Sequence, residues 1–335
     1  MKDITLHIGL PKTGTTSVQR HLLANRSTLA AQGICYPVAG CGRRIAHHDI
    51  ADACKRFKPL WGGLRALRNE FDAEIAPFDR VIVSSEGFQS VRGYPGVIAF
   101  FGAPGGSRRG ACRIRTICYV REFLETASSD YAQQVQSSGL DLSFEDYCAR
   151  RYRRPLWLIS NFWRWFSDEA TFGHFDRSRL FKQDIVEDFF QRIGLAVPGT
   201  VERSDANPSI SGNLLGFKLL LNRHGLHGAR IYWILKDLAL SDPAYRGRFR
   251  LTDTDAARIR QRFASYNKTV AGLVGEIPYR SFEGGQPLPN YETWQADLER
   301  FLAHPELAPL KDRPEIHRAT AEEVAAIARR HGAEP

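Results

Sequence analysis

Short apolar runs alternate, in the first part of the chain, with longer stretches in which apolar residues recur every three or four positions. Three of the short runs, at residues 4–8, 80–85 and 113–120, are β-branched or apolar, and each is followed by a polar turn and a helical pattern. Strands that alternate with helices are joined by crossovers. The pattern therefore predicts an α/β fold, a parallel sheet flanked by helices, with ligand-binding groups at the carboxyl ends of its strands.

The helical pattern dominates from residue 143 onward, so the C-terminal half is predicted to be largely helical. The predicted helical stretches are residues 15–32, 47–76, 155–170, 184–193, 210–222, 252–273 and 290–303. A last helix is predicted at Thr320, because Glu323 follows three residues later in a capping-box pattern. We expect a main domain over residues 1–285 and a helical C-terminal extension over residues 286–335 that packs on it.

Composition and charge narrow the class of protein. Among 335 residues, 46 Lys+Arg against 37 Asp+Glu give a formal net charge of +9, which suits an anionic ligand or acceptor. The six cysteines show no tight pairing, which favours a reducing compartment. No signal-peptide pattern is visible, and apolar stretches such as VIAFFGA are far shorter than the ~20 residues of a membrane span. We therefore expect a cytoplasmic protein without a membrane span.

The first predicted strand runs into a turn that is rich in glycine and hydroxyl residues, HIGLPKTGTTSVQ. A turn between a strand and a helix N-terminus directs several backbone N–H groups at one point, where the helix dipole is also positive. The usual triphosphate loop has a lysine directly after its second glycine, but Thr15 follows Gly14 here and Lys12 lies earlier, within the turn. The segment predicts an anion site. The alternative is a plain turn with a solvated lysine and a Thr15 or Ser17 helix cap.

A second segment, YVREFLETASSDY, places Arg121 at the end of a strand and Ser129 in the following helix. Phe123, Ala127 and Tyr131 are spaced by four and predict the buried stripe of that helix. Ser129 lies roughly 200° around the helix from Ala127, so core packing does not explain it. An arginine and a hydroxyl suit a second phosphate, although a surface arginine and an incidental serine are the simpler interpretation of this segment alone.

Together the two segments resemble the sulfotransferases that use 3′-phosphoadenosine 5′-phosphosulfate (PAPS). In that family a P-K-[ST]-G-T-[ST] turn, here PKTGTT, holds the 5′-phosphosulfate, and an arginine with a serine eight residues later holds the 3′-phosphate. The resemblance extends roughly over residues 1–195, where residues 179–195 resemble the family's strand and following helix. It implies a P-loop-like sulfotransferase fold, PAPS as donor, 3′,5′-ADP as product and no required metal. The nucleotide-binding residues that it implies are Pro11, Lys12, Thr13, Gly14, Thr15, Thr16, Ser17, Arg121 and Ser129.

The late part of the nucleotide site is left open by the resemblance. The Arg-Lys-Gly element with which cytosolic members complete the 3′-phosphate site is not found in this sequence. Arg203 is a candidate for closing over the nucleotide.

Sulfuryl transfer needs charge stabilisation on the leaving phosphate oxygen and a base for the acceptor proton. Lys12, the turn amides and the hydroxyls of Thr15 and Thr16 suit the first role. Glu86, just past the second predicted strand, suits the second, since several carbohydrate-modifying members of the family use a glutamate base. The alternative for Glu86 is a carboxylate that bonds a helix N-terminus or pairs with Arg121.

His47 and His48 are the rival candidates for the base, because a histidine can accept a proton near neutral pH. An adjacent pair that opens a helix also caps or packs against it in many proteins. Three cysteines lie near this pair, Cys35, Cys41 and Cys54, but spacings of five or more residues do not suit a zinc ligand pair. We therefore predict no metal site.

Three other segments have both a functional and a plain interpretation. The run RRYRR at residues 150–154 suits an acidic acceptor, or is a solvated helix end. The tryptophans of LWLISNFWRWF suit a sugar-stacking wall, but the helical spacing of Trp157, Phe162 and Trp165 favours core packing. The basic, glycine-rich stretch at residues 102–113 is predicted to be a surface loop.

The leading hypothesis is thus transfer of a sulfuryl group from PAPS to a hydroxyl or amine of an acceptor, for example an acidic glycan, with no nucleic-acid partner. A P-loop kinase or NTPase is the first alternative. It is disfavoured because position 15 is not lysine and no strand clearly ends in an aspartate for magnesium. The second alternative is a nucleotide-binding protein without catalytic activity.

Overall fold

The computed structural model describes residues 1–42, 44–57, 63–201 and 209–329. Contacts along the chain group into two compact units. Unit 1 contains the described residues of 1–121, 155–204 and 268–277, and unit 2 contains those of 122–154, 205–267 and 278–335. The predicted C-terminal extension, residues 286–335, therefore falls within unit 2 together with segments from earlier in the chain.

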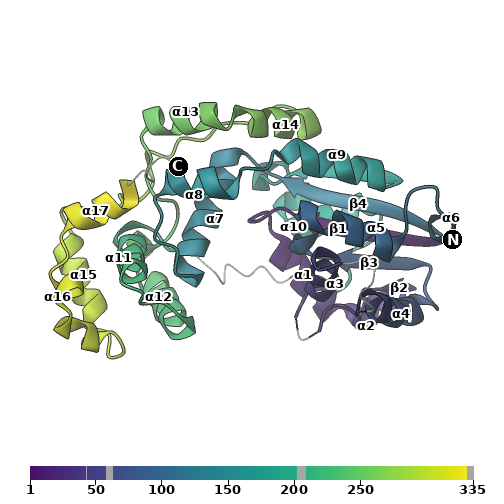
Figure 1. Cartoon of the computed structure of the whole chain (residues 1–335), viewed down its shortest axis with the longest axis horizontal. Coiled ribbons are helices and arrows are strands. Elements are labelled where there is room, and N and C mark those ends of the chain that lie inside the picture. Colours follow the sequence, from purple (N-terminus) through teal and green to yellow (C-terminus); the bar gives the residue numbers. More distant parts are fainter. Residues whose placement is uncertain (43, 58–62, 202–208, 330–335) are drawn as a thin grey trace. The chain divides into compact units, whose positions relative to one another are not determined.

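Unit 1 is built on a parallel sheet of five strands in the order β2-β3-β1-β4-β5 (Figure 1). The strands are β1 (Lys2–Gly9), β2 (Ile34–Cys35), β3 (Arg80–Ser84), β4 (Cys112–Val120) and β5 (Glu169–His174). In the register, Asp3 of β1 stands beside Arg80 of β3 and Arg113 of β4. The three predicted strands and the α/β class are confirmed. Because all five strands are parallel, their carboxyl ends meet at one edge of the sheet.

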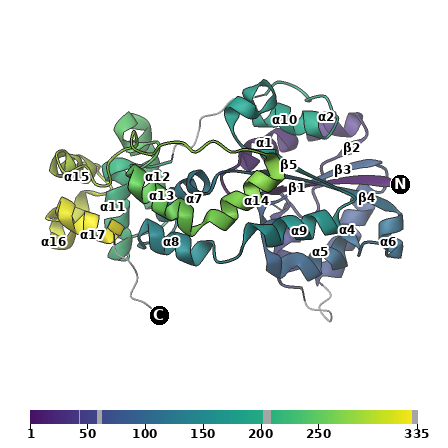
Figure 2. The ribbon, with the colours of Figure 1, turned by 90° about the horizontal axis from the view of Figure 1, so that it is seen from above.

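Helices cover both faces of this sheet (Figure 2). One face carries α1 (Thr15–Ala24), α2 (Arg26–Ala31) and α10 (Ile185–Arg192), and the other carries α3 (His48–Lys55), α4 (Gly63–Ile75), α5 (Tyr94–Phe101) and α9 (Leu156–Phe166). The short elements of unit 1 are η1 (Glu86–Gln89), η2 (Val91–Gly93), α6 (Ser107–Gly110), η3 (Arg177–Arg179) and η4 (Phe181–Gln183). Because the helices cover the faces of the sheet, its carboxyl edge is occupied by the loops that follow the strands.

The two faces of the sheet have different cores. On the first, Val18 and Leu22 of α1 pack with Phe189 of α10 in one buried apolar cluster. On the second, aromatic rings dominate, and Trp163 of α9 lies 6.3 Å from Phe88 of η1 between ring centres. Each fully buried side chain of this size stabilises the fold by roughly 1.5–3 kcal/mol. The aromatic layer links α9 to η1, the short helix that begins with Glu86.

Unit 2 is helical. Its helices are α7 (Phe123–Ser137), α8 (Phe144–Arg151), α11 (Gly212–Arg223), α12 (Ala229–Ser241), η5 (Pro243–Tyr245), α13 (Asp253–Arg262), α15 (Trp294–Leu302), η6 (Ala308–Asp312), α16 (Pro314–His317) and α17 (Ala321–Arg329), while α14 (Ala264–Val274) is divided between the units. Helix α11 is buried from Gly212 to Asn222 and contacts α7, α12, α15 and α17. A helix that is buried all round requires neighbours on every side, so α11 organises this unit.

The predicted capping box of the last helix is confirmed. The Thr320 N–H donates to the Glu323 carboxylate at 2.9 Å, and the Glu323 N–H donates to the Thr320 hydroxyl at 3.2 Å. The two bonds satisfy backbone donors that a helix start otherwise leaves open.

The prediction for residues 155–195 is wrong in two places. Helix α9 ends at Phe166, and the strand of this region is β5, not a segment near residue 179. The predicted strand is excluded because Lys182 and Gln183 have φ values of 50° and 58°, which extended backbone does not allow. The helix that follows, α10, matches the predicted stretch at residues 184–193.

Two predictions about which residues are buried also need correction. Trp157 and Trp165 are 49% and 57% exposed, because the buried line of α9 is Leu156, Ser160, Trp163 and Phe166, a register shifted by about one residue. The predicted surface loop at residues 102–113 contains α6, and its Arg109 is buried against Asp168 at 2.9 Å and the carbonyl of Phe166 at 3.0 Å.

Candidate functional site

The predicted site residues of unit 1 lie directly after its strands. The turn with Lys12 follows β1, Glu86 follows β3, and Arg121 follows β4. Phe175 occupies the same position after β5. In a parallel sheet these four positions share the carboxyl edge, which is where α/β folds bind ligands.

The turn after β1 is held by its own residues. The buried hydroxyl of Thr13 donates to the carbonyl of Leu10 at 2.8 Å and closes the turn. Lys12 has φ 65°, a left-handed conformation that is uncommon for a residue with a side chain and is often found at ligand sites. Pro11, Lys12 and Gly14 are half-buried, whereas Thr16 and Ser17 are exposed.

Helix α1 begins at Thr15 without a side-chain cap and without an acidic residue in its first turn. The first amides of a helix lack internal partners and carry partial positive charge, so an uncapped start is suited to an anion. The hydroxyl of Ser17 is therefore not an N-cap, because the N-cap position is Gly14 with φ 76°.

Both glycines of the turn are required by geometry. A Cβ on Gly9 would lie 1.8 Å from the Thr15 methyl carbon, so only glycine lets Thr15 fold back over the end of β1. A Cβ on Gly14 would lie 2.8 Å from the Phe175 ring, in addition to the strain of its positive φ. The turn is thus pressed against both Thr15 and Phe175.

Glu86 contacts this turn directly. The Thr15 hydroxyl donates a hydrogen bond to Oε1 of Glu86, although the two residues are far apart in the sequence. The short helix that carries Glu86 is capped by the Ser85 hydroxyl, which accepts the Gly87 N–H at 3.1 Å. The predicted base therefore lies beside the start of α1, an arrangement that also agrees with the alternative role of a carboxylate at a helix N-terminus.

His47 is fully buried. Its Nδ1 accepts the Ser84 N–H at 3.1 Å, which leaves the proton on Nε2 to be donated to the carbonyl of Pro37 at 3.1 Å. Burial lowers the pKa of His47 to about 3, so the ring is neutral. With both nitrogens bonded to backbone, His47 joins two segments of the core and has no exposed nitrogen to offer an acceptor.

His48 lies next to Glu86 and keeps part of its surface exposed. Its Nδ1 is 2.9 Å from the hydroxyl of Ser85. Burial lowers the pKa of His48, and the nearby Glu86 carboxylate acts in the opposite direction. Of the two predicted histidines, His48 is therefore the one that the fold brings to the site edge.

A buried polar layer lies below the turn. Nδ1 of His7 is 2.9 Å from the Ser84 hydroxyl, and Gln19 of α1 donates to the same hydroxyl at 3.2 Å. Burial lowers the pKa of His7 to about 4. These bonds tie β1, β3 and α1 together directly behind the residues that the turn presents.

Arg121 shares a neighbour with the turn. Its guanidinium carbon lies 5.5 Å from the centre of the Phe175 ring, and the same ring lies against Gly14. The Phe175 N–H donates to the carbonyl of Val120 at 2.8 Å, which fixes the ring beside the strand that ends at Arg121. The predicted arginine and the predicted anion turn are therefore brought to the same ring within unit 1.

Ser129 lies in unit 2, on α7. The predicted stripe is confirmed, since Phe123, Ala127 and Tyr131 are all completely buried. Between Glu122 and Ala132 every residue except Ser129 is buried. Ser129 is half-buried, so it is the one position of this stretch that is not closed off from solvent. Arg203, the other candidate for the nucleotide site, lies outside the described residues.

Sequence reasoning missed a pocket in unit 2. It has a volume of about 370 Å³ and is lined by two arginines, no carboxylate and several residues without bulky side chains, namely Arg246, Gly247, Arg248, Ser281, Phe282, Gly284, Gly285 and Gln286. This volume is within the range of small-molecule sites. The signal in the sequence was the basic run RGRFR, which contains a glycine between two arginines.

Two chain segments form this pocket by pairing over a short distance. The Gln286 N–H donates to the carbonyl of Arg248 at 2.8 Å, and the Arg250 N–H donates to the carbonyl of Gln286 at 2.7 Å. A Cβ on Gly285 would lie 2.8 Å from the backbone of Phe249, so only glycine allows this approach. The pocket therefore depends on a contact that no local pattern indicates.

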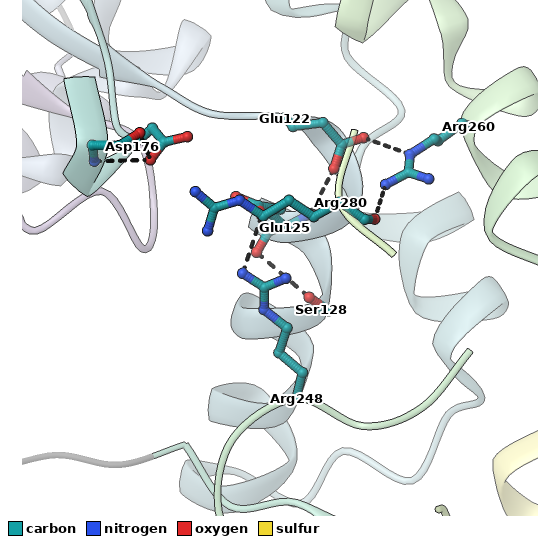
Figure 3. A network of polar contacts seen from close by, with 8 residues as sticks. Glu122, Glu125, Ser128, Asp176, Arg248, Arg260 and Arg280 are labelled. Atoms are coloured by element: carbon teal, nitrogen blue, oxygen red, sulfur yellow. Dashed lines mark hydrogen bonds and ion pairs between the residues drawn. The ribbon is translucent and has the colours of Figure 1, made fainter. Parts of the chain in front are cut away.

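Arg248 connects the pocket to α7. Its Nη2 lies 3.1 Å from Oε1 of Glu125, and its guanidinium carbon lies 5.2 Å from the centre of the Phe282 ring (Figure 3). Glu125 and Ser129 are four residues apart on α7 and so lie on one face of the helix. Within unit 2, an arginine of the pocket is therefore held one helical turn from Ser129.

Among the residues that the structure describes, no group of His, Cys, Asp or Glu is arranged to hold a metal ion. No helix in the described ranges is long and apolar enough to cross a membrane. All six cysteines lie in described segments and all are unpaired.

Comparison of the sequence with protein-family models and with curated proteins found no match. The function is therefore argued from the site itself.

Proposed function

We propose that the protein transfers the sulfuryl group of PAPS to a hydroxyl or amine of an acceptor by in-line displacement. The observation that carries this proposal is the hydrogen bond from Thr15 to Glu86. This bond connects the turn that contains Lys12, which is suited to bind an anion, with the carboxylate of Glu86, which is suited to act as a base. A sulfuryl transferase needs both groups at one point, because charge leaves through the phosphate oxygen while a proton leaves the acceptor.

In the proposed reaction the acceptor oxygen or nitrogen forms a bond to sulfur as the bond from sulfur to the 5′-phosphate oxygen breaks. The acceptor proton passes to Glu86, and 3′,5′-ADP is the leaving group. Lys12, the first amides of α1 and the hydroxyl of Thr16 stabilise the negative charge that develops on the leaving oxygen. The Thr15 hydroxyl has one proton, which it donates to Glu86, so its role is to orient the base.

The 3′-phosphate is assigned to Arg121 and Ser129, the pair that the resemblance implies. Support within unit 2 comes from Ser129, which is only half-buried, and from Arg248, which is held by Glu125 one helical turn before Ser129 on α7. A phosphate monoester carries close to two negative charges at neutral pH. Arginine forks are the side chains best suited to bind it.

His48 is assigned to the acceptor side of Glu86. It is partly exposed, and the Ser85 hydroxyl fixes its orientation. The acceptor itself is proposed to be a molecule with a free hydroxyl or amine, such as an acidic glycan, in keeping with the net charge of +9.

A thermal-shift screen tests the donor assignment. The wild-type protein would be heated with 3′,5′-ADP, 5′-AMP, ATP, and ATP plus magnesium at equal concentrations. A ligand at a hundred times its Kd stabilises the folded state by about 2.7 kcal/mol, so we expect 3′,5′-ADP to give the largest rise in Tm. A larger rise with ATP plus magnesium would favour a kinase or NTPase instead.

Turnover separates an enzyme from a binding protein. PAPS labelled in its sulfate group would be incubated with the protein and a panel of glycans, phenols and amines. Transfer of label by wild type, and its loss in Glu86→Gln, would support the proposal. Tight binding of 3′,5′-ADP without transfer to any member of a broad panel would favour the non-catalytic alternative.

A further inference from the structure

Two carboxylates are buried at the start of α7, where they face three arginines of unit 2 (Figure 3). Glu122 is 1% exposed and Glu125 is 7% exposed. The arginines are Arg248, Arg260 and Arg280. Buried carboxylates are costly unless they are paired and hydrogen-bonded, so each one needs a specific explanation.

Glu122 has a structural explanation. One of its oxygens caps α7 by accepting the Glu125 N–H at 3.0 Å. The other accepts from Nε of Arg260 at 3.2 Å and from the side-chain amide of Asn267 at 3.0 Å. Glu122 is therefore fully used in joining α7 to two later helices.

Glu125 has a different set of contacts. Its Oε1 lies 3.1 Å from Nη2 of Arg248 and 3.5 Å from Nε of Arg280. Arg248 lines the pocket, and its guanidinium also lies over the Phe282 ring. A guanidinium has five N–H donors. The carboxylate holds one edge of the Arg248 fork and the ring supports one face, so the remaining donors keep a fixed direction.

A negative charge at this position works against an anion in the pocket. At about 3 Å from a guanidinium the carboxylate offsets much of its positive charge, and by electrostatics alone a neutral glutamine would let the pocket bind anions more tightly. The carboxylate helps binding only if the direction that it gives to Arg248 outweighs the charge that it cancels. Fixed geometry reduces the ordering cost of binding.

We propose that Glu125 is a positioning residue, which orients Arg248 for an anion bound in the pocket of unit 2. The identity of that anion as the 3′-phosphate of the donor rests on the proposed function. The positioning role does not, since it concerns the pocket and any anion that enters it. Arg280, the second arginine beside Glu125, holds the carboxylate itself in place.

The test compares three variants by calorimetry with 3′,5′-ADP, 5′-AMP and inorganic sulfate. Glu125→Gln removes the charge and keeps the shape. Glu125→Asp keeps the charge and withdraws it by one methylene. Glu145→Gln is the matched control, because it removes the same charge from a carboxylate of unit 2 that pairs with Arg258, a residue outside the pocket lining. Tm is measured for each protein to monitor folding.

The proposal predicts the sign of the effect as well as its size. Both Glu125 variants should bind 3′,5′-ADP about tenfold more weakly or worse, the effect of losing one charge-assisted hydrogen bond. Their affinity for 5′-AMP, which lacks the 3′-phosphate, and the affinity of Glu145→Gln for both ligands should stay at the wild-type value. A general folding defect would weaken both nucleotides together.

Unchanged or tighter binding of 3′,5′-ADP by Glu125→Gln would overturn the positioning role and leave the proposed function standing. If wild type does not bind 3′,5′-ADP, the proposed donor is wrong, and the sulfate titrations then decide the positioning role by the same criterion. If Glu125→Gln does not fold, Glu125→Asp decides. A wild-type affinity in that variant would count against the proposal.

Discussion

His47 provides a pH-dependent prediction that separates its structural role from a catalytic one. The ring is buried and neutral, with a pKa of about 3 in the folded protein against 6.5 for an unperturbed histidine. Between these values the unfolded chain binds a proton that the folded protein does not. The free energy of unfolding therefore rises with pH through this window. The contribution of His47 to it is fully present above about pH 6.5 and is lost as the pH falls toward 3.

The magnitude follows from the two pKa values. Linkage gives a loss of about 2 kcal/mol from His47 between pH 7 and pH 5. His7, whose pKa is lowered to about 4, contributes a similar loss over the same interval. His47→Gln should remove the first of these, so that the loss of stability between pH 7 and pH 5 becomes smaller by about 2 kcal/mol. At pH 7 the variant should also be less stable by about 1–3 kcal/mol, since a buried hydrogen bond is lost.

Urea unfolding at several values between pH 5 and pH 7 measures this directly, with His48→Gln as the matched control. His48 is only partly buried, so its variant should retain most of the wild-type pH dependence. The reasoning is refuted if His47→Gln retains the full wild-type pH dependence. A His47 variant of wild-type stability that cannot transfer sulfate would assign the catalytic role to His47.

Three further predictions concern the turn and the base. Lys12→Ala should lower kcat for sulfate transfer by more than it raises the KM for PAPS, because its charge acts on the leaving oxygen; an unchanged kcat would make Lys12 a binding residue only. Glu86→Gln should lower kcat by roughly 10²–10⁴-fold and leave 3′,5′-ADP affinity near wild type, as the amide still accepts from Thr15; an active variant would exclude Glu86 as the base. Gly9→Ala should destabilise the protein by about 1–3 kcal/mol through overpacking against Thr15, measured as a fall in Tm, whereas Gly272→Ala, where a Cβ meets nothing within 4 Å, should not.

The elements that sequence predicted best are those whose pattern is local and strong. Strands β1, β3 and β4 are rich in β-branched and apolar residues because they lie in the interior of the sheet, with neighbours on both sides. The strand β5 is an edge strand with the sequence EATFGH, and β2 has only two residues. Their pairing with β4 and β3 defines them, and no periodicity indicates it.

The same distinction applies to the site. Lys12, Glu86 and Arg121 were predicted as site residues because each lies in the segment after a predicted strand, and parallel strands share their carboxyl edge. The hydrogen bond between Thr15 and Glu86 agrees with that reasoning. The pocket of unit 2 was missed because it forms where residues 246–248 meet residues 281–286 through backbone pairing. The register of α9 was missed because several spacings of its aromatic residues fit one helix equally well, and the choice of Trp163 comes from packing against rings elsewhere in the chain, those of Phe88 and Tyr94.

Calorimetric titration of wild type and Arg121→Ala with 3′,5′-ADP and with 5′-AMP tests whether the protein recognises the donor by its 3′-phosphate. We predict that wild type binds 3′,5′-ADP at least tenfold more tightly than 5′-AMP, the approximate effect of one or more charge-assisted hydrogen bonds to the 3′-phosphate. Arg121→Ala should remove most of this preference and leave 5′-AMP affinity unchanged. Equal affinity of wild type for the two nucleotides, or equal weakening of both in Arg121→Ala, would show that Arg121 does not bind a 3′-phosphate.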